Sequence, residues 1–386
     1  MISYHELKYK APIRALVDLF ALRHNLSELK KILPERTKIM AAVKADAYGH
    51  GSQRVSLELE KAGVDFFAVF NINEAAQLRS AGIKGDILVF GTTGGQAVYL
   101  AQNNITQTVF NQSIAKDLQQ ECEDSGIHLN IHIKADTGMG RLGFAYSGNS
   151  KQVDEIAGIY KYKNLNVTGI YSHLSGADGT DERTQAYTKL QYERFFSLIT
   201  ELQNRGFDTG ITHIQNSAGI IGTPFACENQ PEFSIARPGI ALYGINPCKN
   251  SKVNLKPVMK LKSEIAMIKT VKKGEYISYG QTFAAPGQME IATVFAGYAD
   301  GYPRALSNKG RVLIGGKYAK IVGVVCMDQI MVDVTGIGAD EGQEVTLFGH
   351  NGDAFLGVDE LAETAGTISY EILSKIGMRV EREYLN

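Results

Sequence analysis

Short apolar runs alternate with longer amphipathic segments over about the first 250 of the 386 residues, and this rhythm limits the fold more than any other feature. A parallel sheet needs such alternation, because each crossover to the next parallel strand is usually made by a helix. The apolar runs cover residues 39–44, 65–70, 86–91, 106–111, 129–136, 167–173, 210–216 and 234–244. The amphipathic segments include residues 18–31, 52–61, 113–125, 151–160 and 181–205. This pattern predicts an α/β fold, a (β/α)8 TIM barrel.

The rhythm changes after about residue 250, where runs rich in Val and Ile are separated by glycine-containing turns. The strand-like runs are residues 259–269, 290–295, 311–314, 320–334 and 344–348, and the helical segments are 358–365 and 369–376. A chain of 386 residues also exceeds the size of one ordinary core. We therefore predict a barrel at residues 11–250 and a mainly β C-terminal domain at residues 251–386. The pattern leaves open whether residues 1–10 join the second domain.

The charge balance argues against several classes of partner. The chain has 40 basic and 41 acidic residues, well mixed, with a formal net charge of -1, so nucleic acids and anionic membranes are not expected. No apolar segment approaches membrane-spanning length, and the first residues lack the apolar region of a signal peptide. The four cysteines are scattered without a CxxC pair, as in a reducing compartment. We expect a cytoplasmic protein.

Polar residues stand at the carboxyl ends of the predicted barrel strands. In such barrels the active site is built there, by the loops that follow the strands. The polar residues in these positions are Lys44, Asp136, His173, Asn216 and, in the last unit, Arg237. They are our first candidates for a functional site.

Two lysines differ in their predicted surroundings. Lys44 ends a buried run, where partial desolvation lowers the pKa of an amine toward the range that suits Schiff-base chemistry. A solvated lysine at a strand end fits the same local pattern. Lys134 alternates with Ile131 and Ile133 and therefore points into the barrel, where an unpaired ammonium is unfavourable.

Longer motifs go beyond these local patterns. They are AVKADAYGHG at residues 42–51, KADTGMGRLG at 134–143, YSHLSGAD at 171–178, HIQNSAG at 213–219, ARPGIALYG at 236–244, SYGQTF at 278–283, AGYADGY at 296–302, CMDQ at 326–329 and SYEI at 369–372. In this order and spacing they resemble the alanine racemase family of fold-type III pyridoxal 5'-phosphate (PLP) enzymes. The resemblance covers essentially the full chain.

The resemblance implies two proton-transfer bases. Lys44 would hold PLP as a Schiff base and then act on one face of the substrate Cα, while Tyr279 would act on the opposite face. A tyrosine has an ordinary pKa near 10, and His173 would be the neighbour that tunes it. In the family this tyrosine comes from the other subunit, so a homodimer with shared sites is implied. A surface tyrosine in a Ser-Tyr-Gly turn is the alternative for Tyr279.

The resemblance also implies a cofactor shell. Arg237, supported by His213, would face the pyridine nitrogen and could only donate a hydrogen bond to it. The remaining cofactor contacts would come from Tyr48, His173, Asn216, Ser217, Gly239, Ile240 and Tyr370. Small residues after the last strands suit a phosphate, because they let backbone amides approach it. The alternatives are an arginine paired with a helix carboxylate and core positions for His213 and Tyr370.

For the substrate, the resemblance implies that Arg141 contacts the carboxylate and that Met327 and Asp328 contribute a wall from the partner subunit. It also implies carbamylation of Lys134, which converts an inward ammonium into an anion able to pair with Arg141. No metal site is expected, because His128 and His132 have no third ligand nearby in sequence. The GxGxxG pattern at residues 138–143 is weak evidence for a dinucleotide site, since no helix follows at once.

The implied activity is racemisation of L- and D-alanine, which in a bacterium supplies D-alanine for peptidoglycan. A broader serine and alanine racemase is an alternative, because an apolar pocket rejects one added hydroxyl poorly. A related barrel-type PLP decarboxylase is another, but it carries a carboxylate where this chain has Arg237. A non-enzymatic PLP carrier would lack the β domain and Tyr279, which this chain has. A nicotinamide dehydrogenase would purify without the yellow colour of a PLP Schiff base.

Overall fold

The computed structural model describes residues 11–91, 94–222, 233–248 and 251–386. They divide into two units. The barrel unit comprises Ala21–Ala47 and Ser52–Lys256, and the β unit comprises residues 11–20, Tyr48–Gly51 and Pro257–Asn386. The domain boundaries predicted above, 11–250 and 251–386, stay a prediction, and the question about residues 1–10 lies outside the described residues.

Eight parallel strands form the barrel unit, in the order β10-β2-β3-β4-β5-β6-β8-β9. Their bounds are β2 (Lys38–Ala42), β3 (Phe66–Val69), β4 (Asp86–Val89), β5 (Ile105–Val109), β6 (Leu129–Asp136), β8 (Leu165–Tyr171), β9 (Ile211–His213) and β10 (Ile235–Ala236). The two end strands are joined by backbone bonds, since Ser234 donates to Thr212 and Arg237 donates to Gln215, both at 3.0 Å. The predicted (β/α)8 fold is confirmed.

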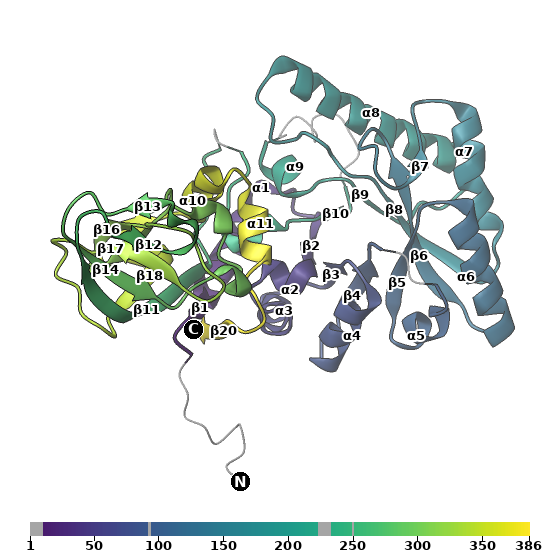
Figure 1. Ribbon diagram of the computed structural model, residues 1–386. Coiled ribbons are helices and arrows are strands. Elements are labelled where there is room, and N and C mark those ends of the chain that lie inside the picture. The colour runs from purple at the N-terminus through teal and green to yellow at the C-terminus, as the bar shows by residue number, and fades with distance from the viewer. Residues whose placement is uncertain (1–10, 92–93, 223–232, 249–250) are drawn as a thin grey trace, which may run out of the picture. The chain divides into compact units, whose positions relative to one another are not determined.

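Helices connect these strands and cover the outside of the sheet. They are α1 (Leu19–Ile32), α3 (Ser52–Lys61), α4 (Ile72–Ser80), α5 (Ala97–Gln102), α6 (Gln112–Ser125), α7 (Ser150–Ala157), α8 (Glu182–Asn204) and α9 (Ser217–Gly222). Figure 1 shows α6, α7 and α8 on the outer side of β6 and β8. Asn71, Asn111 and Asp181 cap α4, α6 and α8 by accepting a backbone amide of the first turn.

Two predicted strands are shorter in the structure. In the run predicted at 234–244, the strand β10 ends at Ala236. Pro238 has no amide hydrogen and restricts the backbone of the residue before it, so the strand does not continue. A 3-10 helix, Ile240–Tyr243, follows. The run at 210–216 ends as a strand at His213, which leaves its last residues free to turn into α9.

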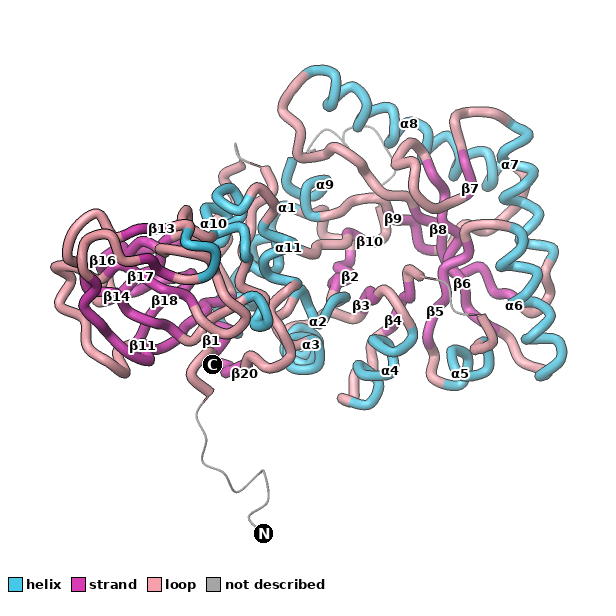
Figure 2. Tube along the Cα trace, viewed as in Figure 1, coloured by secondary structure: helices cyan, strands magenta, loops and turns pink. Residues whose placement is uncertain are grey.

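The β unit is built on the sheet order β16-β15-β18-β11-β1-β20, seen as magenta strands in Figure 2. Its strands include β1 (Arg14–Asp18), β11 (Met259–Val271), β14 (Met289–Val294), β15 (Arg311–Ile314), β16 (Lys317–Lys320), β17 (Ile330–Asp333), β18 (Glu344–Asn351), β19 (Ala354–Leu356) and β20 (Glu381–Leu385). Its helices include α10 (Val358–Ala365) and α11 (Ser369–Ser374). The single strand predicted at 320–334 is wrong, because Gly323 has a φ of +77° and the chain turns before β17 begins.

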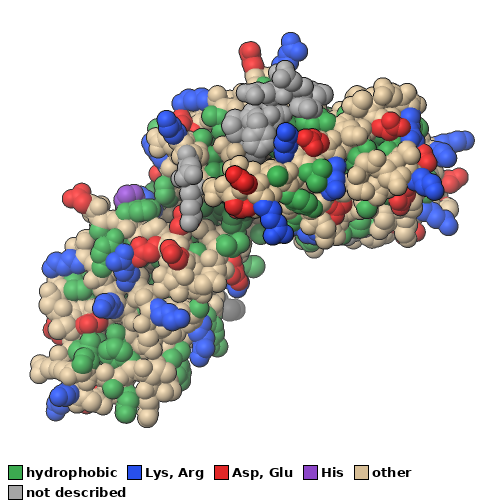
Figure 3. Space-filling view, turned by 90° about the horizontal axis from the view of Figure 1, so that it is seen from above, with side chains coloured by type: hydrophobic (Ala, Val, Ile, Leu, Met, Phe, Trp, Pro, Cys, Tyr) green, Lys and Arg blue, Asp and Glu red, His purple; other side chains and the backbone are tan. Residues whose placement is uncertain are grey.

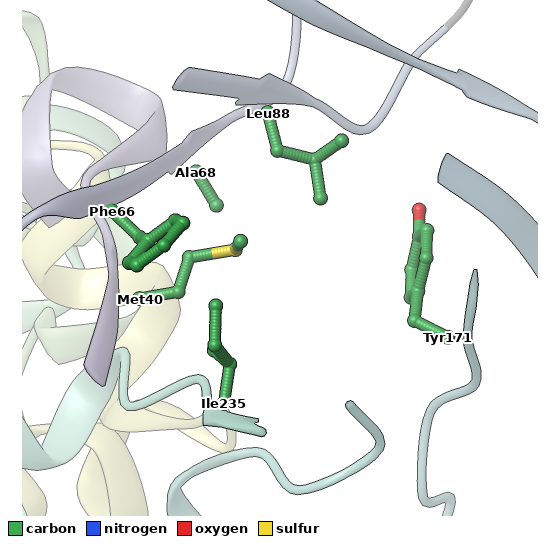
Figure 4. Close-up of a cluster of buried hydrophobic side chains, with 6 residues drawn as sticks. All are labelled: Met40, Phe66, Ala68, Leu88, Tyr171 and Ile235. Atoms are coloured by element: carbon green, nitrogen blue, oxygen red, sulfur yellow. The ribbon is translucent and has the colours of Figure 1, made fainter. Parts of the chain in front are cut away.

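Apolar side chains from five barrel strands pack together in the interior. The cluster in Figure 4 is Met40, Phe66, Ala68, Leu88, Tyr171 and Ile235. Burying an apolar side chain of this size stabilises the fold by about 1.5–3 kcal/mol. This cluster is part of the rigid support beneath the carboxyl ends of the strands.

The surface agrees with the mixed charge of the sequence. The face in Figure 3 shows Lys and Arg side chains interspersed with Asp and Glu side chains. Within the described ranges, no helix combines the length and the apolarity needed to cross a membrane.

We expect Met40→Ala to lower the free energy of unfolding by about 2–5 kcal/mol, because Met40 is 1% exposed and its loss leaves a cavity. Met378→Ala is the matched control, since Met378 is fully exposed, and should change stability by less than about 0.5 kcal/mol. The chain has no tryptophan, so urea unfolding is followed by circular dichroism. Equal losses in the two variants would contradict the assignment of Met40 to the core.

Candidate active site

Lys44 opens a turn with unusual backbone geometry. After β2 ends at Ala42, the helix α2 (Lys44–Tyr48) has φ values of +52° to +54° at residues 45–48. This is the left-handed region, which costs roughly 1–2 kcal/mol for each residue other than glycine. The Asp46 carboxylate accepts a hydrogen bond from the Ser52 amide at 2.8 Å and so ties the turn to α3. Strain of this kind persists only where the surrounding structure enforces it.

The Lys44 amine is desolvated, as expected from the sequence. Burial lowers the pKa of Lys44, and the positive charge of Arg141 lowers the pKa further. The Glu74 carboxylate acts in the opposite direction and raises the pKa of Lys44. Lys44 therefore reaches its neutral, nucleophilic form more easily than an exposed lysine does.

A second lysine lies in the barrel interior beside an aromatic ring. Lys134 is 4% exposed, and its Nζ lies 4.8 Å from the centroid of the Tyr171 ring. The Arg237 guanidinium carbon lies 5.2 Å from the same centroid. Burial, with added repulsion from Arg237 and Arg141, lowers the pKa of Lys134 to about 7. A substantial fraction of this amine is therefore neutral at neutral pH.

Arg237 is the first member of a row of buried side chains that are joined through hydrogen bonds between their nitrogen atoms. Its Nη1 donates to Nδ1 of His213 at 2.7 Å, and Nε2 of His213 lies 3.0 Å from Nδ1 of His132. Because arginine can only donate, neutral His213 carries its proton on Nε2 and donates to His132. Burial lowers the pKa of both histidines, that of His132 to about 3, so both imidazoles are neutral. Arg237 keeps its charge, although burial lowers its pKa to about 10.

His173 also lies beside Arg237. Its Nδ1 is 3.4 Å from Nη2 of Arg237, which also donates to the Ser172 carbonyl at 2.8 Å. Burial, followed by the charges of Arg237 and Lys134, holds the pKa of His173 well below its ordinary value. A neutral imidazole can accept a proton or a hydrogen bond but carries no surplus proton to give.

The loops after β9 and β10 are tied together at Ser217. The Ser217 Oγ accepts hydrogen bonds from the amides of Gly239 at 2.9 Å and Ala241 at 3.2 Å. Its own hydroxyl hydrogen remains available for an acceptor such as a phosphate oxygen. Asn216 holds the start of α9, because its Oδ1 accepts from the Gly219 amide at 2.9 Å. The Gly239 amide, expected at a phosphate, bonds to Ser217 in this structure.

Asp136 shapes the glycine-rich segment that leads to Arg141. Its Oδ1 accepts from the amides of Gly138, Met139 and Gly140 at 2.8–3.1 Å, and its Oδ2 accepts from the Arg141 amide at 3.1 Å. The glycines therefore wrap around a carboxylate of the chain itself. They do not open a helix, in agreement with the low weight given to the GxGxxG pattern.

In the β unit, Tyr279 follows a residue in a strained conformation. Ser278 has φ +67° and ψ -172°, a combination that is almost restricted to glycine. Its Oγ donates to the Val324 carbonyl at 2.7 Å and lies 3.5 Å from Sγ of Cys326. The Tyr279 side chain is 72% exposed, so its phenol is presented on the surface of this unit.

The remaining predicted residues are Tyr48, Tyr370, Met327 and Asp328 in the β unit and Ile240 in the barrel unit. The rings of Tyr48 and Tyr370 lie 6.1 Å apart between centroids, and burial raises the pKa of Tyr48, which keeps it a phenol. Asp328 pairs with Arg379 at 2.7 Å, while Met327 is 52% exposed. Ile240, in the barrel unit, is buried.

Sequence reasoning did not assign a role to His132 and Tyr171 in the barrel unit or to Arg379 in the β unit. Alternation along β6 places His132 on the same strand face as Lys134, and this was the available signal. The partner of His132 comes from β9, 81 residues later, and one strand's pattern does not reveal it. Among the described residues, no three His, Cys, Asp or Glu side chains gather as metal ligands would.

Both units match one family. The description "Alanine racemase, N-terminal domain" matches residues 17–247, and "Alanine racemase, C-terminal domain" matches residues 258–384. An alanine racemase of Geobacter sp. (strain M21) is 45% identical over 96% of this chain and 97% of that protein. One of Methanococcus maripaludis is 41% identical over 97% of this chain and 99% of that protein.

Solved structures agree with these relatives. A crystal structure of alanine racemase from Bacillus anthracis with bound L-Ala-P is 33% identical and has a TM-score of 0.90. The match covers 98% of this chain and 96% of that one. Alanine racemase of Clostridium difficile 630 in complex with cycloserine is 34% identical, with a TM-score of 0.86 and coverage of 98% and 96%.

We expect Ala45→Gly to stabilise the protein by about 0.5–1 kcal/mol, because glycine adopts a positive φ without strain and this gain exceeds its entropic disadvantage. Ala101→Gly is the matched control in the right-handed helix α5 and should destabilise by about 0.5–1 kcal/mol. Urea unfolding measures both. Two losses of equal size would show that the turn at residues 45–48 is not strained.

Proposed function

Because this chain belongs to the alanine racemase family, we propose that it interconverts L- and D-alanine with PLP, using Lys44 and Tyr279 as the two proton carriers. The family and its isomerase activity rest on the full-length matches to both family descriptions. The observation that carries the residue assignment is the group of cationic side chains around Lys44, of which Lys134 and Arg237 are buried. The decarboxylase alternative is not favoured, because the carboxylate it requires is replaced by Arg237.

The donor set fits PLP. Lys44, Lys134, Arg141 and Arg237 act together on His173, each lowering its pKa, so positive charge dominates this region. An anion that carries a phosphate and an aldehyde matches a surplus of cations beside a neutral amine. Ser217, Asn216, Tyr48 and Tyr370 would hold the phosphate, and Gly239 and Ile240 would line it. When bound, PLP supplies an electron-withdrawing ring that stabilises negative charge at the substrate Cα.

Arg237 would set how strongly the ring withdraws electrons. It is a donor at every working pH, and the imidazoles behind it are neutral, so this chain of groups has no proton to deliver to the ring nitrogen. An unprotonated ring is a weaker electron sink, which shortens the life of the carbanion. This limits side reactions such as transamination and favours rapid return of the proton.

Lys44 and Tyr279 would carry the protons. Inversion needs one group on each face of Cα, since a proton removed from one face must be replaced on the other. The lowered pKa of Lys44 suits a base that is neutral before the transfer. We propose that Tyr279 acts across a homodimer contact, which agrees with its exposure of 72% in the single chain. Met327 and Asp328 would lie on the same partner-side wall, and Arg141 would bind the substrate carboxylate.

Lys134 is proposed to be carbamylated. A neutral amine is required, and the lowered pKa of about 7 provides it at neutral pH. The neutral amine nitrogen forms a bond to the carbon of CO2 and releases one proton, which leaves an anion beside Arg141. Counted from the ammonium form, two protons are released in total. This change removes a repulsion between like charges in a desolvated region.

The predicted cytoplasmic location and the supply of D-alanine for peptidoglycan stay predictions.

The racemase assignment is tested with L-alanine in deuterated water, where we expect D-alanine labelled at Cα. Lys44→Ala and Tyr279→Phe should each lower kcat by roughly 10²–10⁴-fold or more, because each removes one proton carrier. Tyr276→Phe is the matched control, since Tyr276 is also exposed and lies three residues away, and it should retain activity. Full activity of Tyr279→Phe would contradict the two-base proposal.

Mixed dimers test the shared site. Coexpressed Lys44→Ala and Tyr279→Phe chains should recover about one quarter of the wild-type activity, because half of the random dimers then contain one intact site. If each site used both residues from one chain, no mixture of these variants would recover activity.

Carbamylation is tested by native mass spectrometry in bicarbonate buffer. We expect a mass increment of one CO2 that disappears on acidification and is missing in Lys134→Ala, because the carbamate loses CO2 when acid protonates it and leaves the lysine amine. An unmodified lysine under these conditions would contradict the proposal.

A further inference from the structure

The carboxylate of Glu74 joins the ends of two neighbouring barrel strands. Its Oε1 accepts the amide hydrogen of Ala45 at 2.7 Å, and its Oε2 accepts that of Phe70 at 2.6 Å. Ala45 lies just beyond β2, and Phe70 lies just beyond β3. Glu74 is itself fixed, since it stands in the first turn of α4 and its amide donates to the Asn71 side chain at 3.0 Å. Bonds to an ionised acceptor are shorter and stronger than neutral ones.

The amide that Glu74 binds belongs to the first strained residue after Lys44. Ala45 begins the left-handed stretch, and its amide is part of the peptide bond that links it to Lys44. A strained turn persists only where other contacts hold it. On its other side the turn is held by Asp46, which accepts from the Ser52 amide. Glu74 therefore restrains the backbone at the point where the Lys44 side chain leaves it.

Charge gives Glu74 a second effect on the same lysine. The groups that shift the pKa of Lys44 are Arg141, which lowers it, and Glu74, which raises it, while burial lowers it most. Other charged or titratable groups face this region: His173 senses the charges of Lys44, Lys134, Arg141 and Arg237. Glu74 is thus a negative charge beside a lysine that is otherwise surrounded by burial and positive charge.

We propose that Glu74 is a positioning residue for Lys44: its carboxylate holds the left-handed turn and supplies the negative charge beside the amine. The inference rests on the proposed function, in which Lys44 carries both PLP and a proton. A cofactor lysine must keep one geometry while its amine changes protonation state. The two oxygens of one carboxylate meet both needs from a residue that does not itself touch the reacting atoms.

Two substitutions separate the two effects. Glu74→Gln removes the charge and keeps one of the two oxygen acceptors, while Glu74→Ala removes the charge and both acceptors. The same pair at Glu60 is the matched control, because the Glu60 carboxylate also accepts two loop amides of the barrel unit, those of Lys84 and Gly85 at 2.8 Å. Glu60 is not among the groups that shift the pKa of Lys44.

The first measurement is the loss of PLP from the purified holoenzyme, followed by its visible absorbance. We expect Glu74→Ala to lose PLP about tenfold faster than wild type, because losing hydrogen bonds to a charged acceptor loosens the turn. Glu74→Gln should lose PLP at a rate between those of wild type and Glu74→Ala, since its one amide oxygen can accept from Ala45 while its NH2 group cannot accept from Phe70. Both Glu60 variants should retain PLP as wild type does.

The second measurement is the pH profile of kcat in both directions of racemisation. The limb that belongs to Lys44 should move to lower pH in Glu74→Gln and Glu74→Ala, because removal of the negative charge lowers the pKa of the amine. Neither Glu60 variant should move it. A purely structural role of Glu74 would lower kcat at every pH without moving this limb.

The inference is overturned if both Glu74 variants match their Glu60 counterparts in PLP loss and in the pH profile. If Glu74→Ala does not fold, the limb position in Glu74→Gln decides alone. The activity of Lys44→Ala distinguishes an error in the role of Glu74 from an error in the proposed function. An active Lys44→Ala enzyme would remove the proposed function, while an inactive one beside unchanged Glu74 variants would remove only the role of Glu74.

Discussion

Positive charge buried at the carboxyl ends of the barrel strands determines how the candidate site works. Arg237 is held in the interior by carbonyl groups and by His213, and it keeps its proton. Its field, together with burial, keeps the neighbouring imidazoles neutral and brings Lys134 close to neutrality at physiological pH. Arg237 is thereby left only as a donor, while neutral His213 accepts from Arg237 and donates to His132. A bound anion would relieve the repulsion among these cations, so the bare chain is already organised for one.

Backbone strain marks both proposed proton carriers, although they belong to different units. Lys44 is followed by four non-glycine residues with positive φ, and Tyr279 is preceded by Ser278 in a conformation almost restricted to glycine. Each strained segment is held by a side-chain bond to the backbone, from Glu74 in one case and to Val324 in the other. Strain of about 1–3 kcal/mol per residue is stable only against such restraints. Fixed side-chain directions suit a reaction in which protons move over short distances.

Sequence patterns predicted the barrel because its buried strands appear as short apolar runs and its helices as longer amphipathic segments between them. They failed where a single residue decides the backbone, as Pro238 does after β10 and Gly323 does after β16. The site motifs were recognised from the order of their residues alone. The sequence therefore predicted which residues form the site, but not the distances and contacts between them. The contacts of His132 with His213 and of Glu74 with Ala45 depend on strand register, which a linear pattern does not contain.

The β unit is assembled from both ends of the sequence. Arg14 to Asp18 in β1 run parallel to Glu381 to Leu385 in β20, so strands about 370 positions apart share one sheet. The barrel sequence lies between them as an insertion. During synthesis on a ribosome, the barrel residues emerge before β20 does, whereas β1 must wait for a neighbouring strand that is translated about 370 residues later. Vectorial synthesis therefore gives the barrel a head start, and the sheet of the second unit is completed only after the whole barrel sequence has been translated.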